Sequence, residues 1–100
     1  MDPEQPNLPL EAIAAFCCAH RVCELALFGS AVRGQLEPES DLDLLVEFKP
    51  GARVGLLKLA RMSRELSSLL GRNVDLVPKD GLKSLIRDDI LAERKVIFAA

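Results

Sequence analysis

The stretch that decides the fold runs from residue 23 to residue 48 and reads CELALFGSAVRGQLEPESDLDLLVEF. Apolar runs of strand length stand at both of its ends, at residues 23–28 and 42–48, and the first leads straight into Gly29-Ser30. Strand periodicity divides the second run into an apolar face and a face that carries two acidic residues. The apolar face holds Leu42, Leu44, Val46 and Phe48, and the other face holds Asp43, Leu45 and Glu47. The stretch therefore predicts two strands joined by a glycine-serine turn and a polar loop.

Helical periodicity is found on both sides of these strands. Apolar residues spaced three or four apart predict helices over residues 10–20 and 55–70, and a third helix that begins after Asp80. Short apolar runs at residues 73–77 and 95–98 predict two more strands. The helix positions expected to face the core are Leu59, Met62, Leu66, Leu69 and Leu70 in the long helix, and Leu82, Leu85, Ile86 and Ile90 in the last one. Residues 1–100 are therefore expected to form a single α/β domain, with residues 1–9 as a disordered N-terminal segment.

The composition narrows the classes of function. The chain has 100 residues, a net charge of −2, four Phe and neither Trp nor Tyr. Proteins that bind nucleic acids usually have a basic face with aromatic side chains that stack on the bases. Because this chain has a net negative charge and neither Trp nor Tyr, polynucleotide binding is disfavoured. A small anionic ligand held through metal ions remains compatible. Because the sequence has no signal peptide and no apolar run near the roughly 20 residues that span a bilayer, we expect a cytoplasmic protein without membrane contact.

Gly29 and Ser30 are candidates for binding a phosphate group. Glycine lets the backbone approach a ligand closely, and the N–H groups after it open a short helix predicted at residues 30–35. The Ser30 hydroxyl adds a donor, and Arg33 can contact the outgoing phosphates of a nucleotide. Glycine-serine pairs are also common in ordinary turns, and a solvated surface position is the alternative for Arg33.

Three aspartates supply candidate metal ligands. Asp41 and Asp43 are two residues apart on an extended chain, which points their side chains the same way with backbones about 6–7 Å apart. If the strand that carries Asp75 pairs beside theirs, Asp75 reaches the same place and can accept the proton of an attacking hydroxyl. Carboxylates so arranged suit one or two divalent cations, and Mg²⁺ is the expected ion. The alternatives are a solvated acidic strand end for the first two, and an ion pair with Arg72 or Lys79 for Asp75.

Three segments together resemble the minimal nucleotidyltransferases (MNT) of the DNA polymerase β-like superfamily. They are residues 29–34 (GSAVRG), 40–46 (SDLDLLV) and 73–77 (NVDLV). The resemblance implies the nucleotidyltransferase fold, a mixed β-sheet of about four strands flanked by helices. It also implies two sets of site residues. Catalysis and the binding of about two Mg²⁺ ions are expected at Asp41, Asp43 and Asp75, and ATP binding at Gly29, Ser30, Arg33 and Ser40.

The resemblance implies a partner as well. Minimal nucleotidyltransferases are commonly antitoxins of HEPN-domain toxin proteins; some members adenylylate a tyrosine of the toxin, and others act mainly by binding. Larger relatives carry an additional domain that presents the acceptor, and the short segment after Asp75 leaves no room for one. The expected function is therefore transfer of AMP from ATP to a HEPN toxin within a hetero-oligomer. The alternatives are an antitoxin that only binds and a nucleotidyltransferase that acts on a small molecule.

Overall fold

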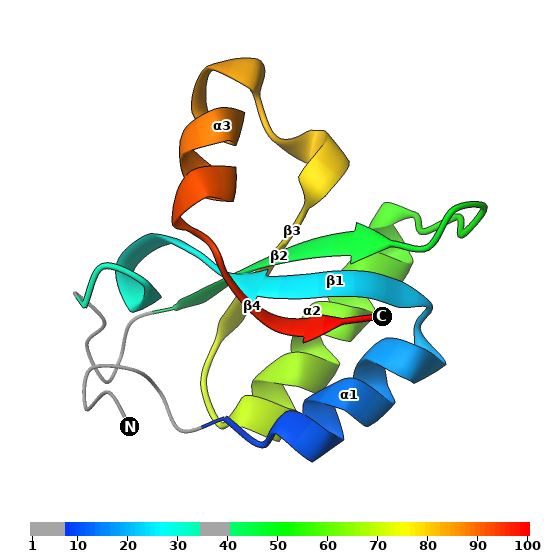
Figure 1. The fold of residues 1–100 in the computed structure, drawn as a ribbon. Coiled ribbons are helices and arrows are strands. Elements are labelled where there is room, and N and C mark those ends of the chain that lie inside the picture. Colours follow the sequence, from blue (N-terminus) through cyan, green and yellow to red (C-terminus); the bar gives the residue numbers. More distant parts are fainter. Residues whose placement is uncertain (1–7, 35–40) are drawn as a thin grey trace.

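A four-stranded β-sheet forms the centre of the structure, a computed structural model that describes residues 8–34 and 41–100 (Figure 1). The helices and strands are α1 (Leu10–Ala19), β1 (Val22–Leu27), β2 (Leu42–Phe48), α2 (Leu56–Leu70), β3 (Val74–Pro78), α3 (Ser84–Glu93) and β4 (Lys95–Ala99). Short 3₁₀ helices lie at Gly29–Ala31 and Lys79–Gly81. In Figure 1, α1 and α2 lie together below the sheet and α3 stands above it. The predicted α/β class and mixed sheet are confirmed.

The strand order brings distant parts of the sequence together at one end of the sheet. The order is β3-β2-β1-β4, in which β1 is antiparallel to β2 and β4, whereas β2 and β3 are parallel. The end of β1 therefore lies beside the start of β2, and the start of β2 lies beside the start of β3. In this register Asp43 pairs with Asp75 across the parallel strands. The condition on which the prediction for Asp75 depended, that its strand pairs beside β2, is met.

The core lies between the sheet and the two helices below it. The predicted apolar face of β2 is buried there through Leu42, Leu44 and Val46, against Ile13 of α1 and Met62 of α2. Burying each of these side chains contributes about 1.5–3 kcal/mol. Leu8 also packs against this core, and the rest of the predicted disordered segment, residues 1–7, lies outside the described residues.

Ser67 and Gly71 fix the way in which α2 leads into β3. Gly71 has a φ of 71°, and its N–H donates to the Ser67 carbonyl at 2.9 Å, which ends the helix as expected of glycine. The Ser67 hydroxyl donates to the Ser63 carbonyl at 2.7 Å and accepts from the Val74 N–H at 2.9 Å. The residue that precedes Asp75 is thus anchored to the last turn of α2.

The prediction of a buried face on α3 is wrong. Leu85 is 91% exposed and Ile86 is 48% exposed, and no residue of α3 is buried. The helix lies in the connection between the two edge strands, β3 and β4, away from the face that α1 and α2 cover. Leu69 of α2 was also expected in the core and is exposed as well. Within the described part of the chain, no helix combines the length and apolar character needed to cross a bilayer.

Candidate functional site

The glycine-serine turn is tied by hydrogen bonds to the start of β2. Gly29 follows β1 with a φ of 71°, and its carbonyl accepts from the N–H groups of Val32 at 3.1 Å and Arg33 at 3.3 Å. The Phe28 N–H donates to the Asp43 carbonyl at 3.1 Å. The helix predicted at residues 30–35 is only a three-residue 3₁₀ helix, Gly29–Ala31, and the predicted part from residue 35 lies outside the described residues.

Gly29 and Asp43 occupy neighbouring space. A Cβ added to Gly29 would lie 2.6 Å from Oδ2 of Asp43, a separation that real Cβ atoms do not adopt. The positive φ of Gly29 is also a conformation that side chains disfavour. The positive φ favours glycine at this position, and any side chain here would have to displace the Asp43 carboxylate, which lies against the backbone of Gly29.

The three predicted aspartates share one electrostatic environment. Asp43 is partly buried, whereas Asp41 and Asp75 are exposed. Burial raises the pKa of Asp43 above its ordinary value, the charges of Asp75 and Asp41 raise it further, and the charge of Arg33 lowers it. Mutual repulsion of this kind is what a bound cation would relieve.

The carboxylates do not converge into a ready-made cage. Within residues 8–34 and 41–100, no three acidic, histidine or cysteine side chains lie close enough to hold a metal ion between them. Mg²⁺ commonly takes only one or two carboxylates and completes its shell with water and substrate phosphates. Asp43 and Asp75, oxygen donors paired on adjacent strands, fit that mode of binding. The assignment of all three aspartates as ligands stays a prediction.

The remaining predicted residues have different surroundings. Arg33 is about half exposed, and its Nε lies 3.4 Å from Oε2 of Glu93 in α3, an ion pair that the sequence did not indicate. Lys79, one of the cations considered as a partner of Asp75, instead donates to Glu47 at 3.1 Å. The predictions for the Ser30 side chain and for Ser40 fall outside what the structure describes.

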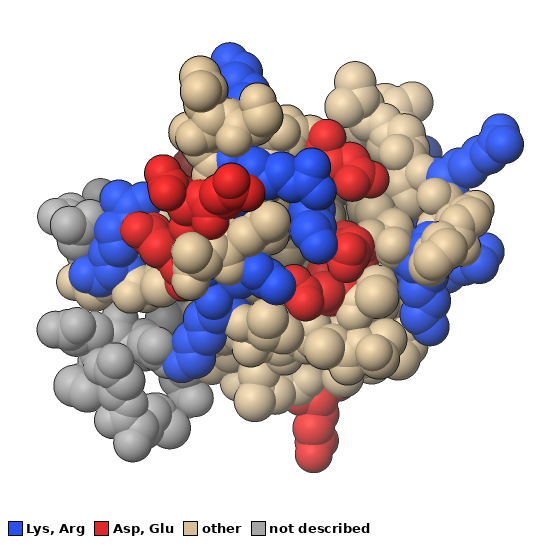
Figure 2. All heavy atoms as spheres, turned by 45° about the horizontal axis from the view of Figure 1, so that its top comes forward, with Lys and Arg blue, Asp and Glu red and all other residues tan. Residues whose placement is uncertain are grey.

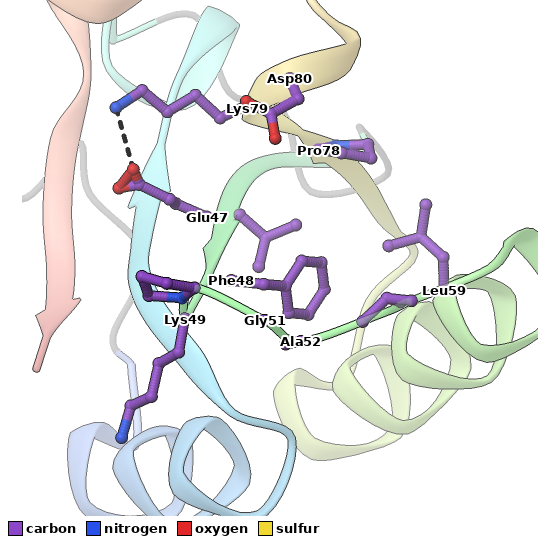
Figure 3. Close-up of a pocket in the computed structure, with 12 residues that line it drawn as sticks. Glu47, Phe48, Lys49, Gly51, Ala52, Leu59, Pro78, Lys79 and Asp80 are labelled. Atoms are coloured by element: carbon purple, nitrogen blue, oxygen red, sulfur yellow. Dashed lines mark hydrogen bonds and ion pairs between the residues drawn. The ribbon is translucent and has the colours of Figure 1, made fainter.

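A cavity of about 360 Å³ lies at the opposite ends of β2 and β3 from the aspartates (Figure 3). Phe48 and Leu59 form an apolar wall, and the Lys79–Glu47 ion pair lies on its polar side. Because Asp43 is at the beginning of β2 and Phe48 is at its end, this cavity is separate from the predicted site.

The charges on the α3 side of the molecule are mixed. Figure 2 shows Lys and Arg side chains interleaved with Asp and Glu over this face. Two of the ion pairs, Lys79–Glu47 and Arg94–Glu24, join residues on or next to the strands of the sheet. Among the described residues, this face therefore has no continuous basic surface of the kind that follows a polynucleotide backbone.

Comparisons with known proteins agree with the motifs and the fold. The chain matches the nucleotidyltransferase domain family over residues 10–97. It is 40% identical over 94 residues to the protein adenylyltransferase MntA of Thermococcus cleftensis, a match that covers 86% of this chain and 93% of that protein.

Solved structures show the same fold. A chain of a toxin–antitoxin structure with AMP-PNP superposes with a TM-score of 0.77 at 20% identity, covering 93% of this chain and 75% of that chain. A chain of the Shewanella oneidensis complex of a tri-AMPylated HEPN toxin with an MNT antitoxin superposes with a TM-score of 0.68 at 17% identity, covering 91% and 70%. From the family match, and from 40% identity over 86% of each chain to a solved structure described as a minimal nucleotidyltransferase, the chain belongs to the nucleotidyltransferase domain family, as a minimal nucleotidyltransferase.

Proposed function

We propose that this protein transfers AMP from ATP to a hydroxyl group of a second protein, in a reaction that depends on Mg²⁺. The observation that carries the proposal is the position of the Asp43 carboxylate, which lies against the backbone of Gly29 and in register with Asp75. A phosphate chain that passes over Gly29 would meet these carboxylates directly. This is the arrangement that nucleotidyl transfer needs, because phosphates and metal-binding oxygens must lie side by side.

The reaction forms one bond and breaks one bond at the α-phosphorus of ATP. The acceptor oxygen attacks that phosphorus, and the bond to the bridging oxygen of the β-phosphate breaks, so that pyrophosphate leaves with the electron pair. Asp75, exposed at the start of β3, is the group we assign to accept the hydroxyl proton. Arg33 and the backbone at Gly29 orient the phosphates. Bound Mg²⁺ would supply positive charge at Asp41, Asp43 and Asp75 against the charge of the phosphates.

The acceptor proposed is a tyrosine of a HEPN toxin, which makes this protein an antitoxin. Support comes from the 40% identity to a protein adenylyltransferase and from the fold shared with the antitoxin of an AMPylated HEPN toxin. The fold shared with a structure that contains AMP-PNP supports ATP as the donor. On the same support, we assign the acceptor to another subunit of a hetero-oligomer.

The test is an AMP-transfer assay with a matched pair of variants. The protein is incubated with ATP, Mg²⁺ and a HEPN-domain protein from the same organism, and the HEPN protein is weighed by intact mass spectrometry. Asp75→Asn is expected to slow the transfer by about 10²–10⁴-fold, the range for loss of a general base. Asp80→Asn, in the 3₁₀ helix that follows the other end of β3, is expected to leave the rate unchanged. If the wild-type protein adds no AMP under any metal condition, the proposal is wrong.

Neutralisation of a toxin by binding alone is the second candidate. The observation in its favour is the exposure of large apolar side chains: Leu56 is 86%, Leu57 is 82% and Leu85 is 91% exposed. A variant with both Asp41→Ala and Asp43→Ala separates the two functions in cells that express the toxin. Protection by this variant would support binding alone. Failure to protect, while the variant still binds the toxin, would support catalysis.

A further inference from the structure

Two ion pairs hold the C-terminal end of α3 to the rest of the molecule. Glu93, the last residue of α3, contacts Arg33 at 3.4 Å, and Arg94 contacts Glu24 of β1 at 2.9 Å. Since no residue of α3 is buried, apolar packing contributes little to its position. The helix continues directly into β4, whose Lys95 pairs with Leu27 of β1, and the Arg33–Glu93 ion pair adds a side-chain contact between the end of the helix and the turn at Gly29.

The position of Glu93 is not explained by the stability of its own helix. The C-terminal end of a helix carries a partial negative charge, so an acidic residue there is disfavoured and a basic one is preferred. The last turn of α3 contains no basic residue, and the cation at this helix end is Arg94 just beyond it, which donates to the Leu91 carbonyl. The ion pair with Arg33 is a favourable contact of Glu93 at this place.

Arg33 is the group through which Glu93 can act on the nucleotide site. Its backbone N–H is bonded to the Gly29 carbonyl, and its guanidinium lies near enough to Asp43 to affect that carboxylate. A guanidinium binds phosphate oxygens and carboxylates with the same donors. Donors engaged by Glu93 are therefore unavailable to a nucleotide.

We propose that Glu93 is a positioning residue that competes with the phosphates of the nucleotide for Arg33. The inference rests on the proposed function, because it requires that ATP bind beside Gly29 and Arg33. Binding of the triphosphate then separates Arg33 from Glu93, while Arg94 stays paired with Glu24. Conversely, any contact that draws Glu93 away strengthens nucleotide binding, which links the exposed helix to the site.

The test is a double-mutant cycle measured by calorimetric titration with AMP-PNP and Mg²⁺. Glu93→Gln is expected to bind AMP-PNP roughly 1.5- to 5-fold more tightly than wild type, the range that exposed ion pairs supply. In an Arg33→Gln background the same change is expected to have no effect. Binding of adenosine, which lacks phosphates, is expected to be the same in wild type and Glu93→Gln.

Asp88→Asn is the matched control, since Asp88 is exposed on the same helix and carries the same charge. Tightening by this variant equal to that by Glu93→Gln would overturn the proposal, because a general change of charge would then explain both. Unchanged affinity in Glu93→Gln, with AMP-PNP bound normally by wild type, would overturn the role of Glu93 and leave the proposed function standing. If neither wild type nor any variant binds AMP-PNP, the proposed function fails and this inference fails with it.

Discussion

The carboxylate of Asp43 occupies the space that a side chain at Gly29 would need, with Oδ2 only 2.6 Å from the position of such a Cβ. The Asp43 carbonyl also accepts the N–H of Phe28, the residue before the glycine. The glycine-serine turn and the aspartate pair, separated in the sequence by a polar loop, are therefore one structural unit. A ligand that approaches the backbone of Gly29 closely therefore lies near the Asp43 carboxylate.

Replacement of this glycine should disturb both the fold and the site. Gly29→Ala places a side chain at a φ of +71° and pushes against Asp43, so we expect a loss of about 1–3 kcal/mol in the free energy of unfolding. Displacement of the Asp43 carboxylate should also weaken the binding of Mg²⁺ with AMP-PNP. Urea denaturation measures the first effect and calorimetric titration the second.

Gly71→Ala is the control that separates backbone strain from contact with Asp43. Gly71 has the same φ of +71°, and nothing lies within 4 Å of the position that a Cβ would take there. Replacing Gly71 by Ala should lower the free energy of unfolding by about 1 kcal/mol, because of backbone strain alone, and should leave nucleotide binding intact. If Gly29→Ala is no more damaging than Gly71→Ala, the contact with Asp43 is not the constraint. The double variant Gly29→Ala, Asp43→Ala is a second check. It should be more stable than Gly29→Ala alone if the contact with Asp43 is the constraint.

Local periodicity was sufficient to predict the two strands on which Asp43 and Asp75 lie. Alternation in β2 separates the buried Leu42 and Leu44 from Asp43, because the faces of a strand differ at every residue. The strand of Asp75 was expected from its apolar run, whereas its pairing beside β2 was only a condition of the prediction, and its parallel register with Asp43 comes from the structure. These features depend on short-range pattern and on simple strand pairing.

Other features could not be predicted because they depend on what lies opposite a residue in space. The spacing of Leu85 and Ile86 indicates an apolar helix face but not whether anything covers it. The ion pair between Arg33 and Glu93 joins residues that are distant in the sequence and have no pattern in common. Both depend on the path of the chain between the two edge strands, which side-chain periodicity does not determine.

The raised pKa of Asp43 predicts that its negative charge opposes folding. A carboxyl group whose pKa is higher in the folded than in the unfolded state binds more protons when folded, so its contribution to stability falls as the pH rises above the ordinary value of 3.8. Asp43→Asn removes that charge. We therefore expect its melting temperature without divalent cations to equal that of wild type near the ordinary pKa and to exceed it at neutral pH. In a domain of 60–100 residues, 1 kcal/mol corresponds to a shift of about 4–8 °C.

Glu47→Gln is the comparison for this measurement, because Glu47 is on the same face of β2 but bonded to Lys79. Its replacement removes an attractive partner, so the melting temperature should stay the same or fall. Mg²⁺ with AMP-PNP should stabilise wild type and Glu47→Gln but not Asp43→Asn. A lower melting temperature for Asp43→Asn than for wild type at neutral pH would contradict the repulsion among the three aspartates.

The same substitution at two leucines tests whether α3 lies free of the core. Leu66 of α2 is completely buried, and Leu66→Ala should lower the free energy of unfolding by about 2–5 kcal/mol. Leu85 of α3 is 91% exposed, and Leu85→Ala should change it by less than about 0.5 kcal/mol. Urea denaturation followed by circular dichroism gives both values. A loss above about 1 kcal/mol at Leu85 would mean that α3 packs against the sheet in solution, so that apolar contacts as well as the Arg33–Glu93 ion pair hold the helix beside the turn at Gly29.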